Sequence, residues 1–545
     1  MSDSQDLANR LAQANRLADE GRVPEAMAEL RRLAGFGPAH ANLALLLEQQ
    51  RDLLGAIGEH RKACALMPDH AQVWFNAGTA LEHARHYQES ETAYRHALSR
   101  HPQFAEAWHN LGNCLQEQGR VLEADQAFQK ALELKPDFWE ARSSHLMNLH
   151  YLSSASPQSI FETARAYAKH FERSEKKTLA TAERPKKIGL LCAYARSHPM
   201  GYLAEAGLTH LDPQRFQLYF YVNEGGEDGT AQRLKSCASA WHSIGALSDQ
   251  AVAGQIRADG IDILIDLAGH TRGHRLGVMA LKPAPVQIHW GVAYWNGLGM
   301  DEVDFILTDR IEAPPANPPP LSEIPLYLPH SFACYRPPDD APPVSPLPML
   351  KGGAPSFGSF NRLAKLNDEV LALWGGLMAK APDGSRLVVQ AHAFDDASVR
   401  QRFLERLSLQ KIAPNQVDLI GALKHDDLLA AYGQVDVVLD CFPWSGSIVT
   451  LEALLMGAPV VTLPHPSIAG RHSASFLSSL GEPGWIAADE EDYIAKALEL
   501  VSDPHRLATI RAGLRARLLA SPVCDGAKFA KDLEEALLGA WLKRG

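Results

Sequence analysis

A 34-residue period in the first 136 residues is the strongest constraint that this sequence places on its fold. Trp74 and Trp108 lie one period apart, and so do Gly78 and Gly112. Other positions keep the same step: Ala93 and Ala127, Tyr94 and Phe128, Ala63, Ala97 and Ala131, and Pro68, Pro102 and Pro136. Small residues let two antiparallel helices approach, aromatic rings fill the gap between them, and proline ends each unit. The period therefore predicts a stack of helical hairpins.

The unit reads Trp-x2-Leu-Gly in its clearest copy, then Ala-aromatic, Ala and Pro, and it resembles the tetratricopeptide repeat. A weaker unit from Gly21 to Pro38 mirrors the one from Gly119 to Pro136, which brings the expected number of repeats to about four. Pro38 and Pro68 are only 30 residues apart, so we expect the second unit to lack about one helical turn.

Three asparagines, Asn42, Asn76 and Asn110, also keep the 34-residue step, two places before the small residue of each first helix. Stacked repeats would align them on one surface. A carboxamide offers both a donor and an acceptor, so such a row can bind the backbone of an extended protein or peptide acceptor without reading its sequence. The alternative is that each asparagine only caps or packs within its own repeat.

Charge and composition exclude several classes of protein. The net charge of −11 provides no electrostatic footprint for nucleic acid or an anionic membrane. No apolar run approaches the roughly 20 residues that span a bilayer, and the polar start, Met1 to Arg10, lacks the order of a signal peptide. The seven cysteines are scattered without a CxxC pair, which favours reduced thiols, and we expect a cytoplasmic protein with no metal site.

The hydrophobic pattern divides the chain into five segments. Residues 1–136 carry the repeats, and 137–184 read as a helical linker (Trp139 to Tyr151, then Pro157 to Lys177). Residues 185–310 alternate short β-rich runs with helices, and 353–545 repeat that alternation and end in a helix from Gly526 to Leu542 that could pack back across the junction. Between them, 311–352 form a proline-rich linker: residues 311–350 hold 13 of the 34 prolines, a composition that we expect to sustain neither helix nor sheet.

The expected strands of the two α/β segments are Ile188–Tyr194, Phe216–Val222, Ile261–Leu267, Val286–Trp290 and Phe305–Thr308, then Ser356–Phe360, Leu387–Ala391, Val417–Ile420, Val435–Leu439 and Pro459–Leu463. They predict a superhelical repeat arm followed by two Rossmann-like domains with a cleft at the carboxyl ends of both sheets. Two such lobes describe the B-fold glycosyltransferases, but also sugar-nucleotide epimerases and periplasmic binding proteins, so motifs must decide the function.

The most informative motif runs from Val435 through Ser445-Gly446-Ser447 to Glu452 and then Gly457-Ala458-Pro459-Val460-Val461. A buried strand ends at Asp440, a turn of small residues follows, and a helix is expected to begin near Ile448. Amides at a helix start favour an anion such as a diphosphate, and Glu452 could accept hydrogen bonds from ribose hydroxyls. An ordinary strand–turn–helix crossover is the competing interpretation. The Glu-Ala and Gly-Ala-Pro-Val-Val combination resembles the nucleotide-binding lobe of B-fold transferases.

Two further motifs point to one family. Gly358-Ser359-Phe360-Asn361-Arg362-Leu363-Ala364-Lys365 ends the first strand of the second lobe, and Ser197-His198-Pro199 follows the first strand of the first lobe. Phe-Asn-x3-Lys and His-Pro at these places resemble the O-linked N-acetylglucosamine transferases. The resemblance implies that Lys365 binds the donor diphosphate and that His198 acts near the donor sugar and the acceptor. Arg362 stands where the family has glutamine, and its guanidinium could also reach phosphate.

The resemblance extends over nearly the whole chain, through Asp262–Gly273, Arg275 and Pro283–Trp290. It implies UDP or UDP-N-acetylglucosamine as ligand, no cofactor, and a nucleotide-sugar site of Arg362, Ser445, Gly446, Ser447, Ile448, Val449, Glu452, Leu423 and His425. It also implies acceptor binding by the asparagine row. The sequence departs from the family at residues 291–299, where Val292 to Gly299 replace Gly-Tyr-Pro-Gly-Thr-Ser-Gly, and at 447–449, where Ser-Ile-Val replaces His-Thr-Thr.

A reaction follows from these motifs. The chain holds no Asp-x-Asp, and Trp444 stands where retaining B-fold enzymes place a second glutamate. We therefore expect an inverting, metal-independent transfer to Ser or Thr hydroxyls of proteins, with Lys365 and the helix amides meeting the leaving-group charge. Two alternatives stay open: transfer to a small or saccharide acceptor, and a repeat adaptor that binds nucleotide-sugar without turnover.

Overall fold

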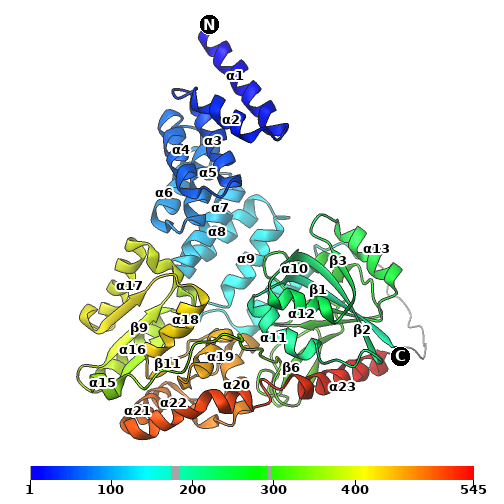
Figure 1. The fold of residues 1–545 in the computed structure, drawn as a ribbon, viewed down its shortest axis with the longest axis vertical. Coiled ribbons are helices and arrows are strands. Elements are labelled where there is room, and N and C mark those ends of the chain that lie inside the picture. Colours follow the sequence, from blue (N-terminus) through cyan, green and yellow to red (C-terminus); the bar gives the residue numbers. More distant parts are fainter. Residues whose placement is uncertain (1, 174–184, 293–295, 545) are drawn as a thin grey trace. The chain divides into compact units, whose positions relative to one another are not determined.

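The computed structural model of the chain describes residues 2–173, 185–292 and 296–544 (Figure 1). They form two compact units. The first unit comprises residues 1–145 together with 392–403, and the second comprises 146–391 and 404–545. The part of the expected linker helix that extends to Lys177, and the sequence departure at 293–295, lie outside the described residues.

The first unit contains four antiparallel helix pairs. Their bounds are α1 Ser2–Asp19, α2 Val23–Arg31, α3 Gly37–Gln49, α4 Leu53–Leu66, α5 Ala71–His83, α6 Tyr87–Arg100, α7 Ala105–Glu117 and α8 Val121–Leu134. The predicted packing is present, because a Cβ at Gly78 would lie 2.7 Å from the Tyr94 ring and one at Gly112 would lie 2.5 Å from the Phe128 ring. The close approach of α5 to α6 and of α7 to α8 therefore requires these two glycines.

The expectation of a shortened second repeat is wrong. Helices α3 and α4 have 13 and 14 residues, as do α5 and α6 and also α7 and α8. The short helix is α2, with nine residues. Pro38 lies in the first turn of α3 rather than after the end of a unit, where proline is equally compatible with a helix.

A short segment of the α/β region belongs to the repeat unit. It includes η2 (His392–Asp395) and the first part of α17 (Ala397–Leu409). Asp396 accepts a hydrogen bond from the amide of Gln88 at 2.9 Å, and the Arg402 guanidinium donates to the side chains of Gln88 and Gln118. The segment therefore contacts the start of α6 and the end of α7, which the sequence period does not reveal.

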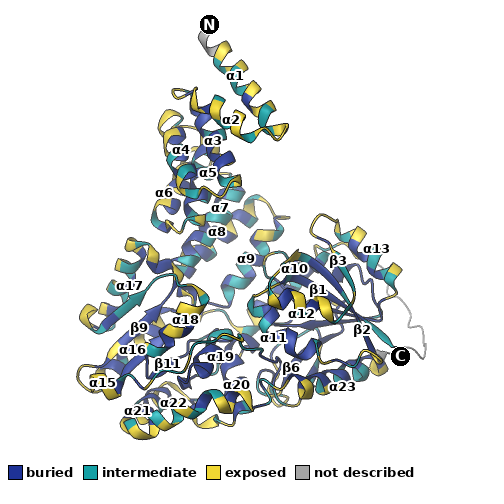
Figure 2. Ribbon diagram, in the orientation of Figure 1, coloured by how far each residue is buried: buried dark blue, intermediate teal, exposed yellow. Residues whose placement is uncertain are grey.

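The first lobe of the second unit is built on a seven-stranded parallel sheet in the order β3-β2-β1-β4-β5-β6-β7. Its strands are β1 Lys186–Ala195, β2 Phe216–Gly225, β3 Ala238–Ser243, β4 Ile263–Asp266, β5 Val286–Trp290, β6 Phe305–Asp309 and β7 Ile324–Leu328. Its helices are α9 Trp139–Leu149, which begins in the first unit, α10 Pro157–Ala168, α11 Pro199–Leu208, α12 Gly229–Ser236, α13 Asp249–Asp259 and α14 Leu276–Ala280. Strands β4 to β6 are buried throughout, as expected for a sheet covered on both faces (Figure 2).

The second lobe has a five-stranded parallel sheet in the order β10-β9-β8-β11-β12. Its strands are β8 Ser356–Ser359, β9 Arg386–Gln390, β10 Val417–Ile420, β11 Val437–Leu439 and β12 Val460–Val461. Its helices are α15 Met349–Gly352, α16 Asp368–Lys380, α17 Ala397–Leu409, α18 His425–Ala431, α19 Ile448–Leu455, α20 His472–Leu480, α21 Glu490–Ser502, α22 Pro504–Leu519 and α23 Gly526–Arg544. The predicted fold class, helical repeats followed by two parallel α/β domains, is confirmed.

Several details differ from or refine the expectation. Edge strand β3 forms in a segment without an apolar run. The proline-rich segment contributes strand β7 and helix α15; β7 tolerates Pro325 because it is an edge strand, where one side of the ladder is unpaired. Helix α10 ends at Ala168, before the expected Lys177.

The last helix, α23, packs on the first lobe: Phe529 stacks on Trp290 at 5.8 Å, and Glu534 accepts a hydrogen bond from the Asp212 amide at 2.9 Å.

Candidate active site

Both sheets reverse their winding direction beside their first strand, between β1 and β4 in one lobe and between β8 and β11 in the other. Such switch points are where open α/β sheets bind ligands. The loop after β1 carries His198, the loop after β8 carries Lys365, and the loop after β11 leads to Ser447 at the N-cap of α19. The topology therefore places three of the predicted site segments at the carboxyl ends of central strands.

The loop from Asp440 to Ser447, here called the phosphate turn, is shaped by the Asp440 carboxylate. One oxygen of Asp440 accepts a hydrogen bond from the Gly446 amide at 2.6 Å, and the other accepts one from the Thr462 hydroxyl at 2.7 Å. The hydroxyl of Tyr493 donates to the Asp440 carbonyl at 2.8 Å. Burial raises the pKa of Asp440. These hydrogen bonds to Asp440 hold the turn in one conformation, a role that the sequence motif does not assign to this residue.

Free donors gather where the phosphate turn meets α19. Within the described residues, the amides of Ser447, Ile448 and Val449 donate to no acceptor, and the Ser447 hydroxyl is buried without a hydrogen-bond partner. Orphan donors at a helix start are the groups that bind anions. From the sequence, the Gly446 amide is expected to be one of these donors, but it already donates a hydrogen bond to the Asp440 carboxylate. The donor array therefore begins at Ser447.

Lys365 brings a cation to the same turn. Its ammonium donates to the Ser445 carbonyl at 2.7 Å and lies 5.1 Å from the centroid of the Trp444 ring. Desolvation lowers the pKa of Lys365, so an anionic ligand beside the ammonium would restore stability to its charged form. Arg362, at the N-cap of η1 (Leu363–Lys365), is exposed. The structure thus brings Lys365 and the phosphate turn together.

The Trp444 ring packs against two residues of the loop between α9 and α10. The Tyr151 ring stacks on it at 4.9 Å with an interplanar angle of 21°, and the His150 ring meets it edge-on at 5.5 Å. Burial lowers the pKa of His150 to about 3. The Asn296 amide donates to His150 at 3.1 Å. The indole thus forms a buried platform beside the Lys365 ammonium, whereas the sequence draws attention to Trp444 only through the acid that it replaces.

Glu452 lies one turn into α19 and pairs with a second predicted residue. His425 Nε2 lies 2.8 Å from the Glu452 carboxylate, and this hydrogen bond raises the pKa of His425. Leu423 is half-buried just before α18, in which His425 is the first residue. The Tyr202 ring, from α11 of the first lobe, lies parallel to His425 at 6.0 Å. His425 therefore faces both a carboxylate of its own lobe and an aromatic ring of the other lobe.

A polar cavity of about 480 Å³ opens beside His425. It is lined by the first lobe, the loop after β7 and the second lobe: Ser197, Tyr202, Gly229, Thr230, Arg233, Arg336, Pro337, Pro338, Asp339, Asp340, His425 and Asp426. Arg233 and Arg336 both pair with the buried carboxylate of Glu205. The volume falls in the range of small-molecule sites.

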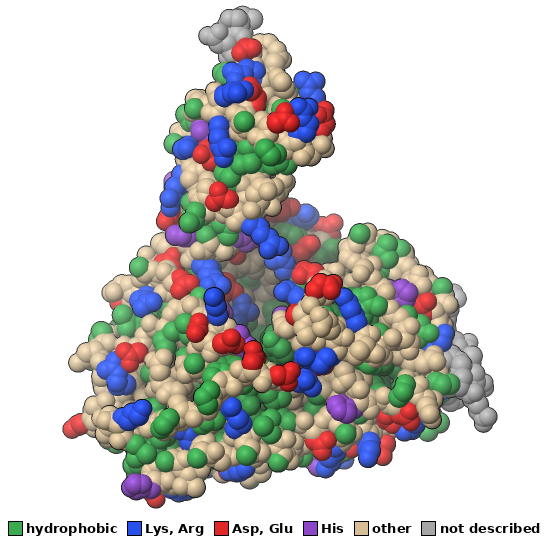
Figure 3. All heavy atoms as spheres, in the orientation of Figure 1, with side chains coloured by type: hydrophobic (Ala, Val, Ile, Leu, Met, Phe, Trp, Pro, Cys, Tyr) green, Lys and Arg blue, Asp and Glu red, His purple; other side chains and the backbone are tan. Residues whose placement is uncertain are grey.

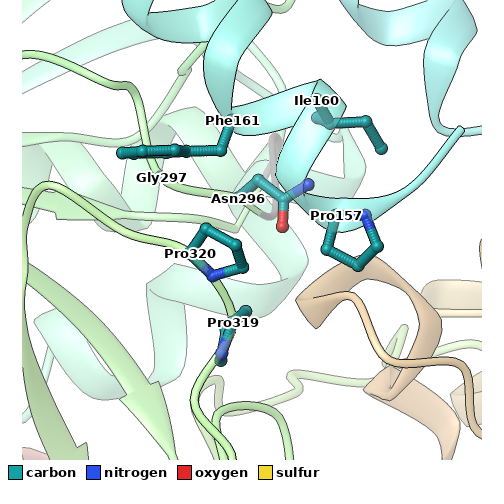
Figure 4. A pocket seen from close by; sticks show the side chains of 7 residues that line it. All are labelled: Pro157, Ile160, Phe161, Asn296, Gly297, Pro319 and Pro320. Atoms are coloured by element: carbon teal, nitrogen blue, oxygen red, sulfur yellow. The ribbon is translucent and has the colours of Figure 1, made fainter.

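A second hollow, lined by Pro157, Ile160, Phe161, Asn296, Gly297, Pro319 and Pro320, has about 10 Å³ and could hold one water molecule at most (Figure 4).

His198 caps α11 in the first lobe. Its Nδ1 accepts a hydrogen bond from the Met200 amide at 3.3 Å, and its ring lies 4.7 Å from that of Tyr194. Burial and the charge of Arg196 lower the pKa of His198 to about 4. The imidazole is therefore neutral at physiological pH and can accept a proton or a hydrogen bond, although as a weak base.

In the repeat unit, the three asparagines lie half-buried on the first helices α3, α5 and α7. Asn42 donates to Asn15 of α1 at 2.7 Å, and Asn110 donates weakly to Thr79 of α5 at 3.5 Å. Asn76 accepts from Gln72 of its own helix at 2.8 Å. Two of the three side chains therefore link successive first helices, and Asn15 extends the row by a residue that the 34-residue step does not reach.

On the face shown in Figure 3, basic and acidic side chains are interspersed over both units. Across residues 2–173, 185–292 and 296–544, no helix is long and apolar enough to cross a membrane, and no group of three or more His, Cys, Asp and Glu side chains could hold a metal ion. The cysteines described are free thiols.

Two parallel α/β lobes, a helix start with unpaired amide donors, a half-buried lysine and a carboxylate one turn further on fit the class of nucleotide-sugar-dependent glycosyltransferases. Comparison with known proteins agrees: the model of glycosyl transferase family 41 matches residues 161–335 and 349–533, and tetratricopeptide models match 71–104 and 105–138. The chain belongs to glycosyl transferase family 41.

Its relatives include plant proteins named probable UDP-N-acetylglucosamine–peptide N-acetylglucosaminyltransferase SPINDLY. The chain is 34% identical to the one from Solanum lycopersicum over 411 residues, which are 74% of this chain and 44% of the relative, and 35% identical to the one from Arabidopsis thaliana over 413 residues, 74% and 45%. The chain thus spans less than half the length of these relatives. Among solved structures, a mutant of the Thermobaculum terrenum O-GlcNAc transferase superposes with a TM-score of 0.86 at 31% identity, covering 93% of this chain and 98% of that one.

Proposed function

We propose that this protein transfers N-acetylglucosamine from UDP-N-acetylglucosamine to Ser or Thr hydroxyls of protein acceptors, with inversion and without a metal ion. The observation that carries the proposal is the hydrogen bond from the Lys365 ammonium to the Ser445 carbonyl. It places a cation on the phosphate turn, beside the unpaired amides that begin at Ser447. The names and family of its relatives support the donor and the acceptor class.

The donor's diphosphate would bind between Lys365 and the amides of Ser447 to Val449, where a cation and oriented donors converge. The ribose hydroxyls would bind the Glu452 carboxylate, which His425 orients from the side of the polar cavity. The Ser-Ile-Val sequence at 447–449 offers no imidazole and only one hydroxyl, so phosphate binding there depends mainly on the backbone amides.

The reaction is a single displacement. The acceptor hydroxyl oxygen bonds to the anomeric carbon on the face opposite UDP, and the bond from that carbon to the diphosphate oxygen breaks. Its electron pair leaves with UDP, where Lys365 and the helix amides stabilise the charge. The hydroxyl proton departs on the first-lobe side, where neutral His198 can accept it or hold the hydroxyl in place.

Inversion is supported by Trp444. Retaining B-fold enzymes place a second glutamate here, and the position instead holds a buried indole packed on Tyr151. Metal independence is supported by Lys365, which supplies the positive charge that a metal–diphosphate complex would otherwise supply.

The test uses the purified 545-residue chain, radiolabelled UDP-N-acetylglucosamine and a cell lysate as acceptor. We expect label on protein, abolished in Lys365→Met and unaffected in Lys380→Met, a matched control on the exposed end of α16. EDTA should leave labelling unchanged. Loss of labelling on chelation would refute the metal-free mechanism.

The same assay separates the alternatives. UDP release without labelled protein would indicate a small or saccharide acceptor. Tight UDP binding by calorimetry with no turnover for any of a panel of UDP-sugars would indicate a nucleotide-sugar-binding adaptor. Equal labelling by wild-type and Lys365→Met protein would remove Lys365, and with it the proposed cleft, from the reaction.

A further inference from the structure

The first turn of α20 contacts both the phosphate turn and the first lobe. Helix α20 runs from His472 to Leu480, and His472, Ser473 and Ser475 in its first turn are each fully buried. None of these residues stands out in the sequence, because histidine and serine are common on exposed helix starts. Full burial of three polar side chains in one turn is unusual and requires partners for each.

On one side, Ser473 clamps the phosphate turn. Its hydroxyl lies 2.7 Å from the Thr450 hydroxyl of α19 and donates to the Gly446 carbonyl at 3.2 Å. The Ser445 amide in turn donates to the Ala469 carbonyl at 3.0 Å, just before α20. The carbonyl of Ser445, which the Lys365 ammonium contacts, is therefore set by the segment that begins α20.

On the other side, two acidic residues at and just beyond the end of β6 hold the same helical turn. Ser475 donates to the Asp309 carboxylate at 2.5 Å, and His472 Nδ1 bonds the Glu312 carboxyl group. Asp309 also accepts from the amides of Ile311, Glu312 and Phe332 at 2.8, 2.9 and 3.0 Å. The Asp309 carboxylate is thus held in place by the backbone of its own lobe, and the two lobes meet in a buried polar cluster.

Burial favours the neutral forms of both members of the Glu312–His472 pair. Burial, with the nearby Asp309 carboxylate, raises the pKa of Glu312 well above its usual range, and burial, with the nearby Lys365 ammonium, lowers the pKa of His472. In its neutral form Glu312 donates to His472 Nδ1, and the Thr308 hydroxyl donates to the other oxygen of Glu312 at 3.2 Å. A neutral carboxamide could make the same two hydrogen bonds.

We propose that the first turn of α20 is a positioning element: Asp309 and Glu312 of the first lobe, acting through Ser475 and His472, hold Ser473 and the phosphate turn in the geometry that binds the donor diphosphate. The inference rests on the proposed function for the identity of the ligand. It assigns no contact with substrate to any of these residues, and it makes the first lobe a determinant of affinity at the second-lobe nucleotide site.

Two serines on α20 provide a matched comparison. Ser475 and Ser479 both donate a hydrogen bond to the first lobe, Ser479 to the His330 carbonyl at 2.7 Å, but only Ser475 lies in the first turn. We expect Ser475→Ala to weaken UDP binding by about tenfold in calorimetry, the order of effect of removing one hydrogen bond to a charged group. Ser479→Ala should leave UDP affinity and transfer at wild-type values. Equal UDP affinity in the two variants would overturn the proposal.

Glu312 offers a second comparison that keeps the proposal testable if Ser475→Ala does not fold. Glu312→Gln retains both hydrogen bonds and should bind UDP as the wild type does, whereas Glu312→Leu should lose affinity and lower kcat. A Gln variant as weak as the Leu variant would contradict the positioning role.

Hydrogen exchange of the amides in residues 440–452 requires no nucleotide and isolates this inference from the choice of ligand. Exchange there should accelerate in Glu312→Leu and remain at the wild-type rate in Glu312→Gln and Ser479→Ala. If UDP fails to bind but this pattern holds, the proposed donor is wrong and the positioning element stands. Unchanged exchange in Glu312→Leu would overturn it.

Discussion

The Asp440 carboxylate and the Gly446 amide, joined at 2.6 Å, close the phosphate turn into one buried loop before α19 begins. This contact leaves no space for a side chain at position 446. A Cβ there would lie 2.4 Å from the Thr450 hydroxyl and 3.0 Å from Asp440. To admit any residue larger than glycine, either the Thr450 hydroxyl, which bonds Ser473, or the turn itself must shift.

We therefore expect Gly446→Ala to weaken UDP binding by about tenfold or more, because the Ser447–Val449 amides move with the turn. Calorimetry with UDP measures this directly. Gly539→Ala is the matched control, since a Cβ at that position of α23 meets nothing within 4 Å. It should stabilise the protein slightly, by up to about 1 kcal/mol for a glycine within a helix. Unchanged UDP affinity in Gly446→Ala would mean that the phosphate binds elsewhere.

The His425–Glu452 pair should make stability depend on pH in a defined direction. The hydrogen bond raises the pKa of His425 in the folded protein. A raised folded-state pKa contributes stability that is present in full below the unfolded value of about 6.5 and is lost as the pH rises through the folded-state pKa. The free energy of unfolding should thus differ more between wild type and His425→Gln at about pH 6 than at about pH 9. Urea denaturation at both pH values checks this, and a difference that grew with pH would contradict the pairing.

Glu452 itself should act on nucleotide affinity. Glu452→Ala removes the proposed ribose acceptor and should weaken UDP binding by about 1–3 kcal/mol. The measurement is calorimetry at neutral pH on protein with a wild-type unfolding profile. Equal affinity in a folded variant would return Glu452 to a purely structural role beside His425.

Much of the fold could be read from the sequence because its signals are local and periodic. The repeat step locates the helix pairs, and the apolar runs locate the strands to within a few residues, apart from the two edge strands β3 and β7. The features that the sequence did not predict depend on contacts between segments far apart in the chain. Strand β7 forms inside a proline-rich segment because it needs a partner on one side only, and no local pattern signals that β6 is available.

The same division applies to the site. Lys365, Glu452 and the Ser445–Val449 turn follow strand ends, so topology brings them together and the motif could find them. His425 was found only through the family resemblance, and its bond to Glu452 emerged from the structure. Glu312 and His472 are separated by 160 positions in the chain and meet only through the packing of two lobes. Sequence spacing carries no information on such contacts, although a buried-strand aspartate such as Asp440 could have been singled out as the anchor of its turn.

The asparagine row should affect acceptor use and not donor chemistry. Replacing Asn42, Asn76 and Asn110 together by alanine should reduce labelling of protein acceptors, because the carboxamides that would bind the acceptor backbone are removed. Hydrolysis of UDP-N-acetylglucosamine should be unchanged. Gln129→Ala, which removes an exposed carboxamide from the second helix α8, is the control. An unaltered acceptor profile in the triple variant would assign the asparagines to contacts between repeats, such as Asn42 with Asn15.

His198 and Lys365 should fail in different ways, and this difference separates a transferase from a protein that only binds nucleotide-sugar. Lys365 contacts the phosphate turn, so Lys365→Ala should lose UDP affinity and turnover together, and Lys365→Met, which keeps most of the side-chain length, should be no better. His198 lies on the first lobe, so His198→Ala should bind UDP almost normally and yet transfer about 10²–10⁴-fold more slowly. Because the pKa of His198 is about 4, protonation of this imidazole should not slow the wild-type enzyme as the pH drops from about 8 to about 6. Near-wild-type transfer by His198→Ala would exclude this histidine from the chemistry and direct attention to other first-lobe groups at the cleft.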